Sequence, residues 1–155
     1  MLRDRSLVPL SQQHHNGLAL CVLTERSIRA DASPANVARL AKRAIDRYEI
    51  ELVNHFAIEE EILFPEIERR LGGHPLVREL IGEHRSIERI IDGLRAQPSA
   101  ALLEDLSSLL RTHIRREEND LFEEIQKRLP REVLDALGEQ IDAKAVRVCL
   151  ESDGT

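Results

Sequence analysis

A seventeen-residue pattern with one histidine and a pair of adjacent glutamates occurs twice in the chain. A shift of 58 residues lays residues 55–71, HFAIEEEILFPEIERRL, over residues 113–129, HIRREENDLFEEIQKRL, with nine identities in seventeen positions. Two amphipathic helices share leucines readily, but apolar periodicity alone does not explain a shared histidine and a shared glutamate pair. The repeated pattern, HxxxEExxLFxEIxxRL, therefore indicates a chemical role.

The histidine and the first glutamate of each copy are four residues apart, which places them on the same side of an α-helix. Positions four apart differ by about 40° around the helix axis and by one turn along it. His55 therefore points the same way as Glu59, and His113 the same way as Glu117. The apolar residues of both segments share these directions, so both pairs are predicted to face the core.

Two further histidines are predicted to face the same core. His84 lies among leucine and isoleucine residues on the apolar side of its segment. In the neighbouring pair His14 and His15, the first falls near the middle of the apolar face and the second on its flank. The strings LSQQHH (10–15) and LIGEHR (80–85) also match when His14 is aligned with His84. We therefore favour His14 as the inward residue and keep His15 as the alternative.

Carboxylates buried at Glu59 and Glu117 need a compensating positive charge. No inward-facing arginine or lysine is placed to supply it, whereas metal ions would. Imidazole and carboxylate ligands without a thiolate suit iron or manganese, with zinc less likely, and two carboxylates that can each bridge favour a dinuclear site. We expect two iron ions joined by an oxo or hydroxo bridge, with positions left open for a small molecule. The expected ligands are His14 or His15, His55, Glu59, His84, His113 and Glu117.

Each of these residues has a structural explanation when it is taken alone. A single inward histidine such as His84 is more often a hydrogen-bonded core residue than a ligand, and one His-Glu pair can be a surface ion pair. Glu60 and Glu118, which follow the inward glutamates, fit an outer hydrogen-bonding role and a solvated position equally well. His74 is interpreted as a surface or helix-start residue. The metal hypothesis depends on the whole set.

Composition and helix signals predict a single all-α domain over residues 1–155. The chain is 42% hydrophobic, 32% charged and 3% aromatic, which is typical of helical proteins. Short connections favour an up-down-up-down antiparallel four-helix bundle over about residues 7–130, with a short additional C-terminal helix and tail over residues 131–155. Candidate caps at Ser11, Ser33 and Ser99 and helix-breaking residues predict long helices over about residues 11–28, 34–71, 75 to 93–98 and 100–129. A shorter amphipathic stretch follows, with Val133, Leu134, Leu137 and Ile141 on one side.

Charge and residue usage argue against several classes of protein. A net charge of −6 without a dense basic cluster argues against nucleic acid as a partner. The N-terminal sequence MLRDRSLVPL lacks the apolar stretch of a signal peptide, and no segment approaches a membrane span, so we expect a cytoplasmic location and no membrane partner. Cys21 and Cys149 form no CxxC motif or disulfide framework and are interpreted as a buried thiol and a tail thiol.

Together these motifs resemble the hemerythrin-like, HHE cation-binding family. The resemblance covers roughly residues 7–130 and rests on LSQQHHNGL, HFAIEEEILFPEI, LIGEHRSIERI and HIRREENDLFEEI in that order. It implies an antiparallel four-helix bundle with a non-haem di-iron centre and bridging glutamates. The ligands implied by position are His14 (or His15), His55, Glu59, His84, His113 and Glu117.

The chain departs from the oxygen-carrying hemerythrins at two positions. Those proteins place a second histidine one turn after the first in helix three, where this chain has Glu88. Their last acidic ligand follows its histidine by five residues, where this chain offers Glu117 at four and Glu118 at five. The missing histidine leaves an additional position open and argues against reversible oxygen storage.

The resemblance implies a di-iron protein that binds or reacts with O2, NO or peroxide. Related proteins with fewer histidines are associated with sensing oxygen, iron or nitric oxide and with peroxide or nitrosative stress, so we expect a role in sensing, stress response or iron handling. A redox or signalling protein is the expected macromolecular partner. Two alternatives stay open: a metal-stabilised or metal-free helical interaction module with structural histidines, and an enzyme with peroxidase-like turnover at the same centre.

Overall fold

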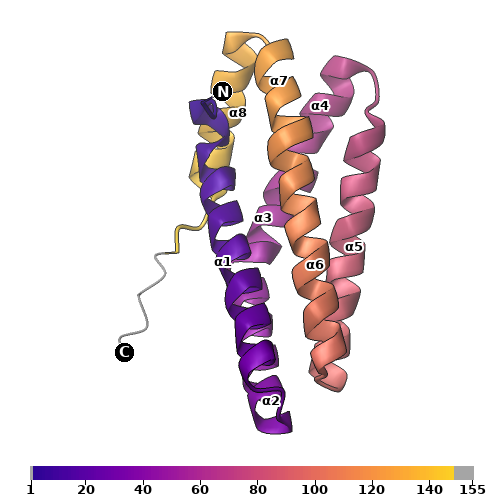
Figure 1. Cartoon of the computed structure of the whole chain (residues 1–155). Helices are drawn as coiled ribbons and strands as arrows, with labels where there is room; N and C mark the ends of the chain where they lie inside the picture. The colour runs from indigo at the N-terminus through magenta and orange to yellow at the C-terminus, as the bar shows by residue number, and fades with distance from the viewer. Residues whose placement is uncertain (1, 149–155) are drawn as a thin grey trace.

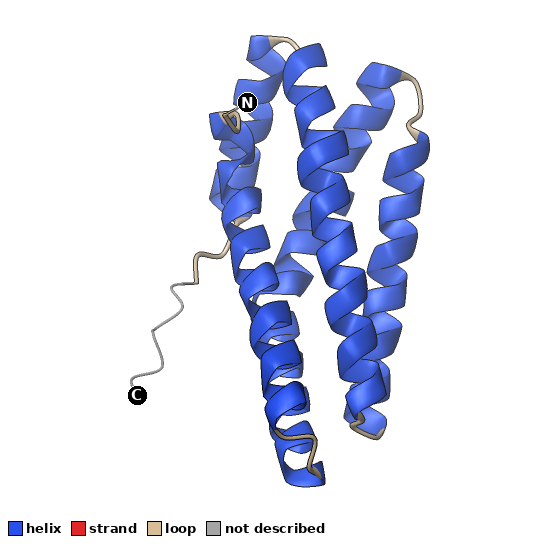
Figure 2. Ribbon diagram, in the orientation of Figure 1, coloured by secondary structure: helices blue, strands red, loops and turns tan. Residues whose placement is uncertain are grey.

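Residues 2–148 of the computed structural model form helices joined by short loops, and no strand occurs within that range (Figure 2). Four long helical rods lie side by side, and α8 packs next to the start of the first rod (Figure 1). The all-α prediction is confirmed, as is the added C-terminal helix. The elements are η1 (Arg5–Leu7) and α1 (Val8–Ala30); α2 (Pro34–Arg47), η2 (Tyr48–Leu52), α3 (Val53–Ile58), η3 (Glu59–Leu63) and α4 (Phe64–Leu71); α5 (Pro75–Ala96); α6 (Ala100–Arg116), η4 (Glu117–Phe122) and α7 (Glu123–Arg128); and α8 (Arg131–Lys144).

Capping side chains and a glycine explain three ends of two rods. The hydroxyl of Ser33 accepts a backbone N–H at the start of α2, and that of Ser99 does so at the start of α6. Each satisfies one of the backbone donors that a helix leaves unpaired at its first turn. Gly72 ends α4 with a φ of 70°, a left-handed conformation that favours glycine. These boundaries agree with the sequence predictions.

The first helix begins earlier than the sequence predicts. The chain enters it through η1, where the carboxylate of Asp4 accepts the N–H of Ser6 at 3.0 Å. Ser11, the predicted cap, lies inside α1 and donates its hydroxyl hydrogen to Glu118 at 2.6 Å. The prediction was wrong because the serine has a tertiary partner that local sequence does not reveal.

Three π-helical segments interrupt the two rods that carry the repeat. The N–H of Val53 bonds to the carbonyl of Tyr48, and the N–H of Phe64 to that of Glu59, five residues back in each case. Two of the segments, η3 and η4, begin at Glu59 and Glu117. The regular 100° step used to interpret the sequence is therefore wrong for these turns. Single π turns inside α-helices occur frequently at functional sites.

Two apolar clusters fill the interior of the bundle. One includes Leu10, Phe64 and Leu80 and is completed by the buried side of α8; the other includes Cys21 and Leu106. A short polar stretch separates the residues of the two clusters in α1, in α5 and in the rod of α6, η4 and α7, whereas Phe56 and Ile58 in α3 belong to different clusters and lie two residues apart. The prediction for α8 is confirmed, because all four of the apolar residues that define its inner side are buried: Val133, Leu134, Leu137 and Ile141.

Cys21 is a buried thiol, as the sequence predicts. It is 1% exposed, and burial raises its pKa to about 11. The other cysteine, Cys149, lies outside the described residues. No helix within residues 2–148 has the length and apolar character needed to cross a membrane. The cytoplasmic location stays a prediction.

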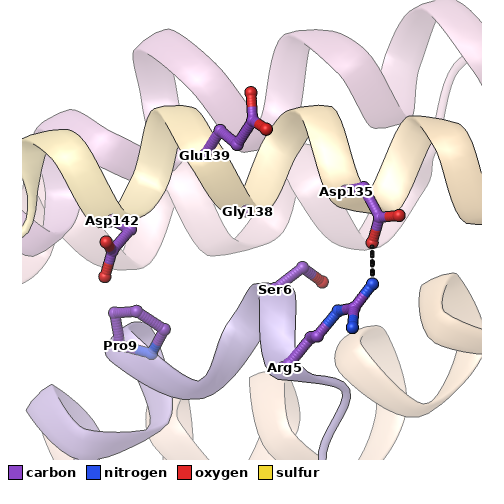
Figure 3. A pocket seen from close by; sticks show the side chains of 7 residues that line it. All are labelled: Arg5, Ser6, Pro9, Asp135, Gly138, Glu139 and Asp142. Atoms are coloured by element: carbon purple, nitrogen blue, oxygen red, sulfur yellow. Dashed lines mark hydrogen bonds and ion pairs between the residues drawn. The ribbon is translucent and has the colours of Figure 1, made fainter.

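The helix α8 approaches the N-terminal turn closely. A Cβ atom built on Gly138 would lie 3.0 Å from the Cα of Ser6, closer than most Cβ contacts, so this close approach favours glycine. Beside it Arg5 pairs with Asp135 at 3.0 Å (Figure 3). A surface cavity of about 410 Å³ adjoins this contact and is lined by Arg5, Ser6, Pro9, Asp135, Gly138, Glu139 and Asp142.

Candidate metal centre

Six of the seven predicted ligands meet at one level of the bundle. They lie where the two apolar clusters meet, and each is at most 4% exposed. The seventh, His15, is exposed and lies outside the group. Of the two alternatives in α1, the structure therefore brings His14 into the cluster. The six residues are His14 from α1, His55 from α3, Glu59 from η3, His84 from α5, His113 from α6 and Glu117 from η4.

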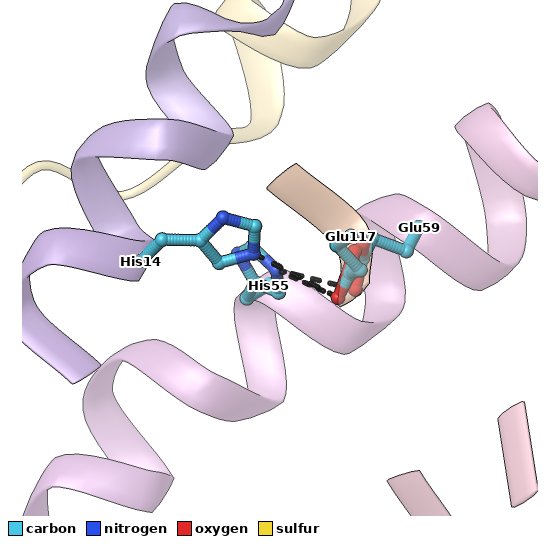
Figure 4. Close-up of side chains that lie close together, drawn as sticks. All are labelled: His14, His55, Glu59 and Glu117. Carbon is cyan, nitrogen blue, oxygen red and sulfur yellow. Dashed lines mark ion pairs between the residues drawn. The ribbon is translucent and has the colours of Figure 1, made fainter. Parts of the chain in front are cut away.

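The six side chains form two overlapping sets that share both glutamates. The first set contains His14 and His55 with Glu59 and Glu117, and the second contains His84 and His113 with the same two glutamates. Within each set, one ligand atom from each residue lies within 4.8 Å of the others. Figure 4 shows the first set, in which the two imidazoles from α1 and α3 point toward the carboxylates. Each set has the size of a site for one ion.

Glu59 contacts one histidine of each set. Its Oε1 lies 3.2 Å from Nε2 of His55 and 3.1 Å from Nε2 of His84. Its other oxygen, Oε2, is buried without a hydrogen-bond partner. Because one carboxylate faces both sets, it is placed to bridge two ions.

Glu117 repeats this arrangement from the other copy of the pattern. Its Oε1 lies 2.5 Å from Nε2 of His113 and 3.7 Å from Nε2 of His14. Both of its carboxylate oxygens are buried without a hydrogen bond. The two glutamates therefore contact both sets from two different rods.

Each histidine uses its second ring nitrogen, Nδ1, for a partner outside the cluster. Nδ1 of His14 donates to Glu118 at 2.6 Å, and Nδ1 of His84 donates to Glu60 at 2.9 Å. These glutamates directly follow the shared ones in the two copies of the repeat. Of the two interpretations that the sequence left open for Glu60 and Glu118, the structure therefore shows the outer hydrogen-bonding role.

The other two histidines have outer partners that the sequence interpretation missed. Nδ1 of His55 donates to the amide oxygen of Gln13 at 2.9 Å, and Nδ1 of His113 donates to Glu83 at 3.0 Å. Both partners directly precede the inward histidine of their own rod. The available signal was their equivalent position in the matched strings LSQQHH and LIGEHR.

The hydrogen bonds to Nδ1 determine what the cluster can bind. A carboxylate or amide oxygen only accepts, so each Nδ1 carries the hydrogen and the lone pair of a neutral imidazole is on Nε2. A lone pair facing carboxylate oxygens at these distances is repulsive unless a cation lies between them. An unsatisfied buried polar atom costs about 1–3 kcal/mol. The buried polar atoms of this cluster that have no hydrogen-bond partner are Nε2 of His14, His55 and His113, Oε2 of Glu59, and both carboxylate oxygens of Glu117.

The family model of the hemerythrin HHE cation-binding domain matches residues 9–125. The chain belongs to this hemerythrin family. The matched range contains all six clustered residues. No curated protein and no solved structure matches the chain. The cation binding that names this family agrees with the cluster, whose imidazole nitrogens and carboxylate oxygens are suited to metal ions and mostly lack other partners.

The two departures from the oxygen-carrying hemerythrins have clear positions in the structure. Glu88, which stands where those proteins have a second histidine, pairs with Arg85 at 2.5 Å and lies outside the cluster. Of the two acidic residues in η4, Glu117 is fully buried in the cluster, whereas Glu118 is the outer partner of His14. This hemerythrin domain therefore offers two histidines in each set.

Burial and neighbouring charges control protonation in the cluster. Burial lowers the pKa of His14 and of His113, which favours the neutral imidazole that binds metals. Burial would raise the pKa of Glu59, and only positive charge facing its carboxylate, on protonated His55 and His84 or on a bound cation, lowers the pKa below its usual range. Glu118 also has a pKa lowered against the effect of burial, to about 2, chiefly by its bond from His14.

Aromatic rings pack against one histidine of each set. Phe64 and Phe122, at equivalent positions of the repeat, stack on His84 and His14 with ring centroids 5.9 and 5.5 Å apart. Phe56, which follows His55 in the sequence, also stacks on His84, with ring centroids 3.9 Å apart. The rings restrict imidazole rotation and exclude water from the buried side of the centre.

A cavity of about 320 Å³ lies next to the first set. It runs between α1 and α6, and His14 forms part of its wall. The space is large enough for small molecules such as O2, NO or peroxide. Its lining residues are Arg3, Ser11, His14, His15, Leu18, Ile114 and Glu118.

Proposed function

We propose that this hemerythrin-family protein is a non-haem di-iron protein, with one ion in each set and with Glu59 and Glu117 shared between the ions. The single observation that carries the proposal is the pair of overlapping buried sets whose two carboxylates face both. Two histidines per ion and shared carboxylates suit iron better than manganese or zinc. An antiparallel up-down-up-down arrangement of the four long rods is part of the same proposal.

The residues of the chain hold, orient and insulate the centre. Outer partners on every Nδ1 keep the imidazoles in the tautomer whose Nε2 faces inward. The phenylalanine rings and the two apolar clusters exclude bulk water. Two ions bound here would supply redox chemistry and open coordination positions, because the chain offers only two histidines to each.

We propose that the small ligand is O2, NO or peroxide and that the protein acts in sensing or in oxidative or nitrosative stress and iron handling. The buried donor set and the neighbouring cavity support a small ligand rather than a large substrate. A sensing role requires a redox or signalling protein that responds to the state of the centre. A peroxidase-like enzyme differs from a sensor in sustaining turnover.

Iron loading combined with optical spectroscopy tests this function. The chain is loaded with ferrous iron without oxygen and desalted, and absorption is recorded before and after air, dithionite, azide, NO and peroxide. We expect about two irons per chain and absorption bands that change with azide and with reduction. Steady consumption of peroxide with a reductant would identify an enzyme.

The matched control is His15→Ala, which removes the exposed neighbour of His14 and should change neither iron content nor spectrum. The double variant His55→Ala and His113→Ala should lose both. A well-folded wild-type chain that binds no iron would contradict the proposal and favour the metal-free interaction module.

A further inference from the structure

The segment after α8 is attached to the side of the bundle that carries the first set. We call residues 145–148 the C-terminal strap. The N–H of Val146 donates to Oδ1 of Asn54 at 3.0 Å, and Nδ2 of Asn54 donates to the carbonyl of Lys144 at 3.0 Å. Nδ2 of Asn16 donates to the carbonyl of Val148 at 3.2 Å. Side-chain amides of α1 and α3 therefore hold the backbone of the strap.

Gln13 connects this strap to the metal centre. Its Oε1 accepts from Nδ1 of His55 at 2.9 Å. Its Nε2 donates to Oδ1 of Asn54 at 2.9 Å and to the carbonyl of Val146 at 3.1 Å. The side chain is 4% exposed, so these partners replace water. One amide group thus contacts a ligand of the first set on one side and the strap on the other.

The equivalent residue of the second set shows why a glutamine is needed at this position. Glu83 accepts from His113 at 3.0 Å and from the guanidinium of Arg116 at 2.6 Å. A carboxylate suits these two bonds because both neighbours are donors. At Gln13 one neighbour is a donor and the strap offers a carbonyl acceptor, so only a group that both accepts and donates satisfies both.

We propose that Gln13 is a positioning residue through which docking of the C-terminal strap fixes the orientation of His55. The inference rests on the proposed di-iron function. A docked strap holds the amide so that its oxygen faces Nδ1, and the ring then presents Nε2 to the ion of the first set. Because linkage is reciprocal, binding of that ion must favour the docked strap by the same factor. A change at the centre is thereby transmitted to the surface of the protein.

Trypsin cleavage after Arg147 measures docking directly, since this side chain is 62% exposed but its backbone lies within the strap. A protease needs an extended, undocked segment. We expect loading of the wild-type chain with two equivalents of ferrous iron to slow this cleavage about fivefold or more. Equal cleavage rates with and without iron would overturn the inference.

Asn54→Leu removes one of the side chains that anchor the strap without changing a predicted ligand. We expect cleavage after Arg147 to accelerate, and one of the two irons to pass to a chelator about fivefold or more faster while the other is unaffected. The matched control is Glu83→Gln, which alters the outer partner of the second set and should leave cleavage after Arg147 unchanged. Faster cleavage in Asn54→Leu with unchanged release of both irons would overturn the inference.

A further measurement separates this inference from the proposed function. If the wild-type chain binds no iron, the di-iron proposal fails, and the link is then judged in the metal-free protein by the NMR signal of the Nδ1 proton of His55. We expect Asn54→Leu to shift this signal and leave that of His113 in place. An unshifted His55 signal would overturn the positioning role of Gln13.

Discussion

The two halves of the cluster share their inward-facing residue types but differ in what holds them from outside. Each set has one histidine from the repeated pattern, one from a matched string, and the same two carboxylates. In the second set, both outer partners are carboxylates, Glu60 and Glu83, and each pairs with an arginine, Arg85 or Arg116. The second set is therefore held by ion pairs between neighbouring rods.

The first set is held by the two ends of the described chain. One outer partner, Glu118, accepts from Arg3 in the N-terminal segment at 2.7 Å. The other, Gln13, is bonded to the C-terminal strap. The cavity that borders His14 lies on this side as well. The repeat therefore duplicates the inward residues, while only the first half is bonded to the N-terminal segment and to the C-terminal strap.

The largest effect should come from a residue that both halves share. Glu59→Gln removes the charge of a bridging carboxylate while keeping its size, so iron content after desalting should fall from about two per chain to nearly none. Metal analysis measures this, and circular dichroism checks the fold. His15→Ala is the matched control and should retain both irons. Retention of one full equivalent in Glu59→Gln would contradict the shared role.

Removing one unshared histidine should affect only its own half. His14→Ala should retain the ion of the second set, and His84→Ala that of the first, with about one iron per chain in each variant. The reason is that each variant keeps one set intact. Loss of both ions from both variants would instead indicate a centre that binds its ions only as a pair.

Changing an outer hydrogen-bond partner should affect iron binding less than removing a ligand. Glu83→Gln gives the second set the same outer amide as the first and weakens its hold on His113. We expect its ion to transfer to a chelator roughly tenfold faster. Stopped-flow release with a coloured chelator measures the two rates. If both rates are unchanged, the outer partners do not account for the difference between the halves.

Acid should lower the stability of the iron-loaded protein at least as steeply as that of the metal-free one. Because the pKa values of His14 and His113 are lowered in the folded state, the unfolded chain binds more protons below about pH 6.5. The free energy of unfolding should then fall with decreasing pH, by at most about 1.4 kcal/mol per pH unit for each histidine.

Glu118 extends this loss to lower pH. Its folded pKa of about 2 lies below the ordinary value, so its contribution to stability is present above about pH 4.3 and disappears toward pH 2. Urea unfolding at several pH values measures both effects. Bound ions keep the imidazoles deprotonated in the folded state, and unfolding releases the ions, so the loaded protein should show a slope at least as steep as that of the metal-free protein between pH 7 and 5. A smaller slope in the loaded protein would contradict this account.

The inward residues could be predicted from the sequence because periodicity and the repeat both define them. His55 and Glu59 share one face at the regular α-helical spacing, and residues 113–129 provide an independent second copy of the pair. Capping by Ser33 and Ser99 is likewise a local property. What is local in the chain was therefore predicted correctly.

The remaining features depend on contacts between distant segments. The π turns at Glu59 and Glu117 have no local sequence signal that separates them from α-helix. The roles of Gln13 and Glu83 become visible only when two rods are side by side, and Ser11 was misinterpreted as a cap for the same reason. Tertiary partners decided each of these cases.

Anomalous diffraction at the iron absorption edge, on crystals of the loaded protein, tests the central claim most directly. The account predicts two peaks per chain, one contacted by His14 and His55 and the other by His84 and His113, with Glu59 and Glu117 touching both. A single peak, or a peak contacted by neither shared glutamate, would contradict it.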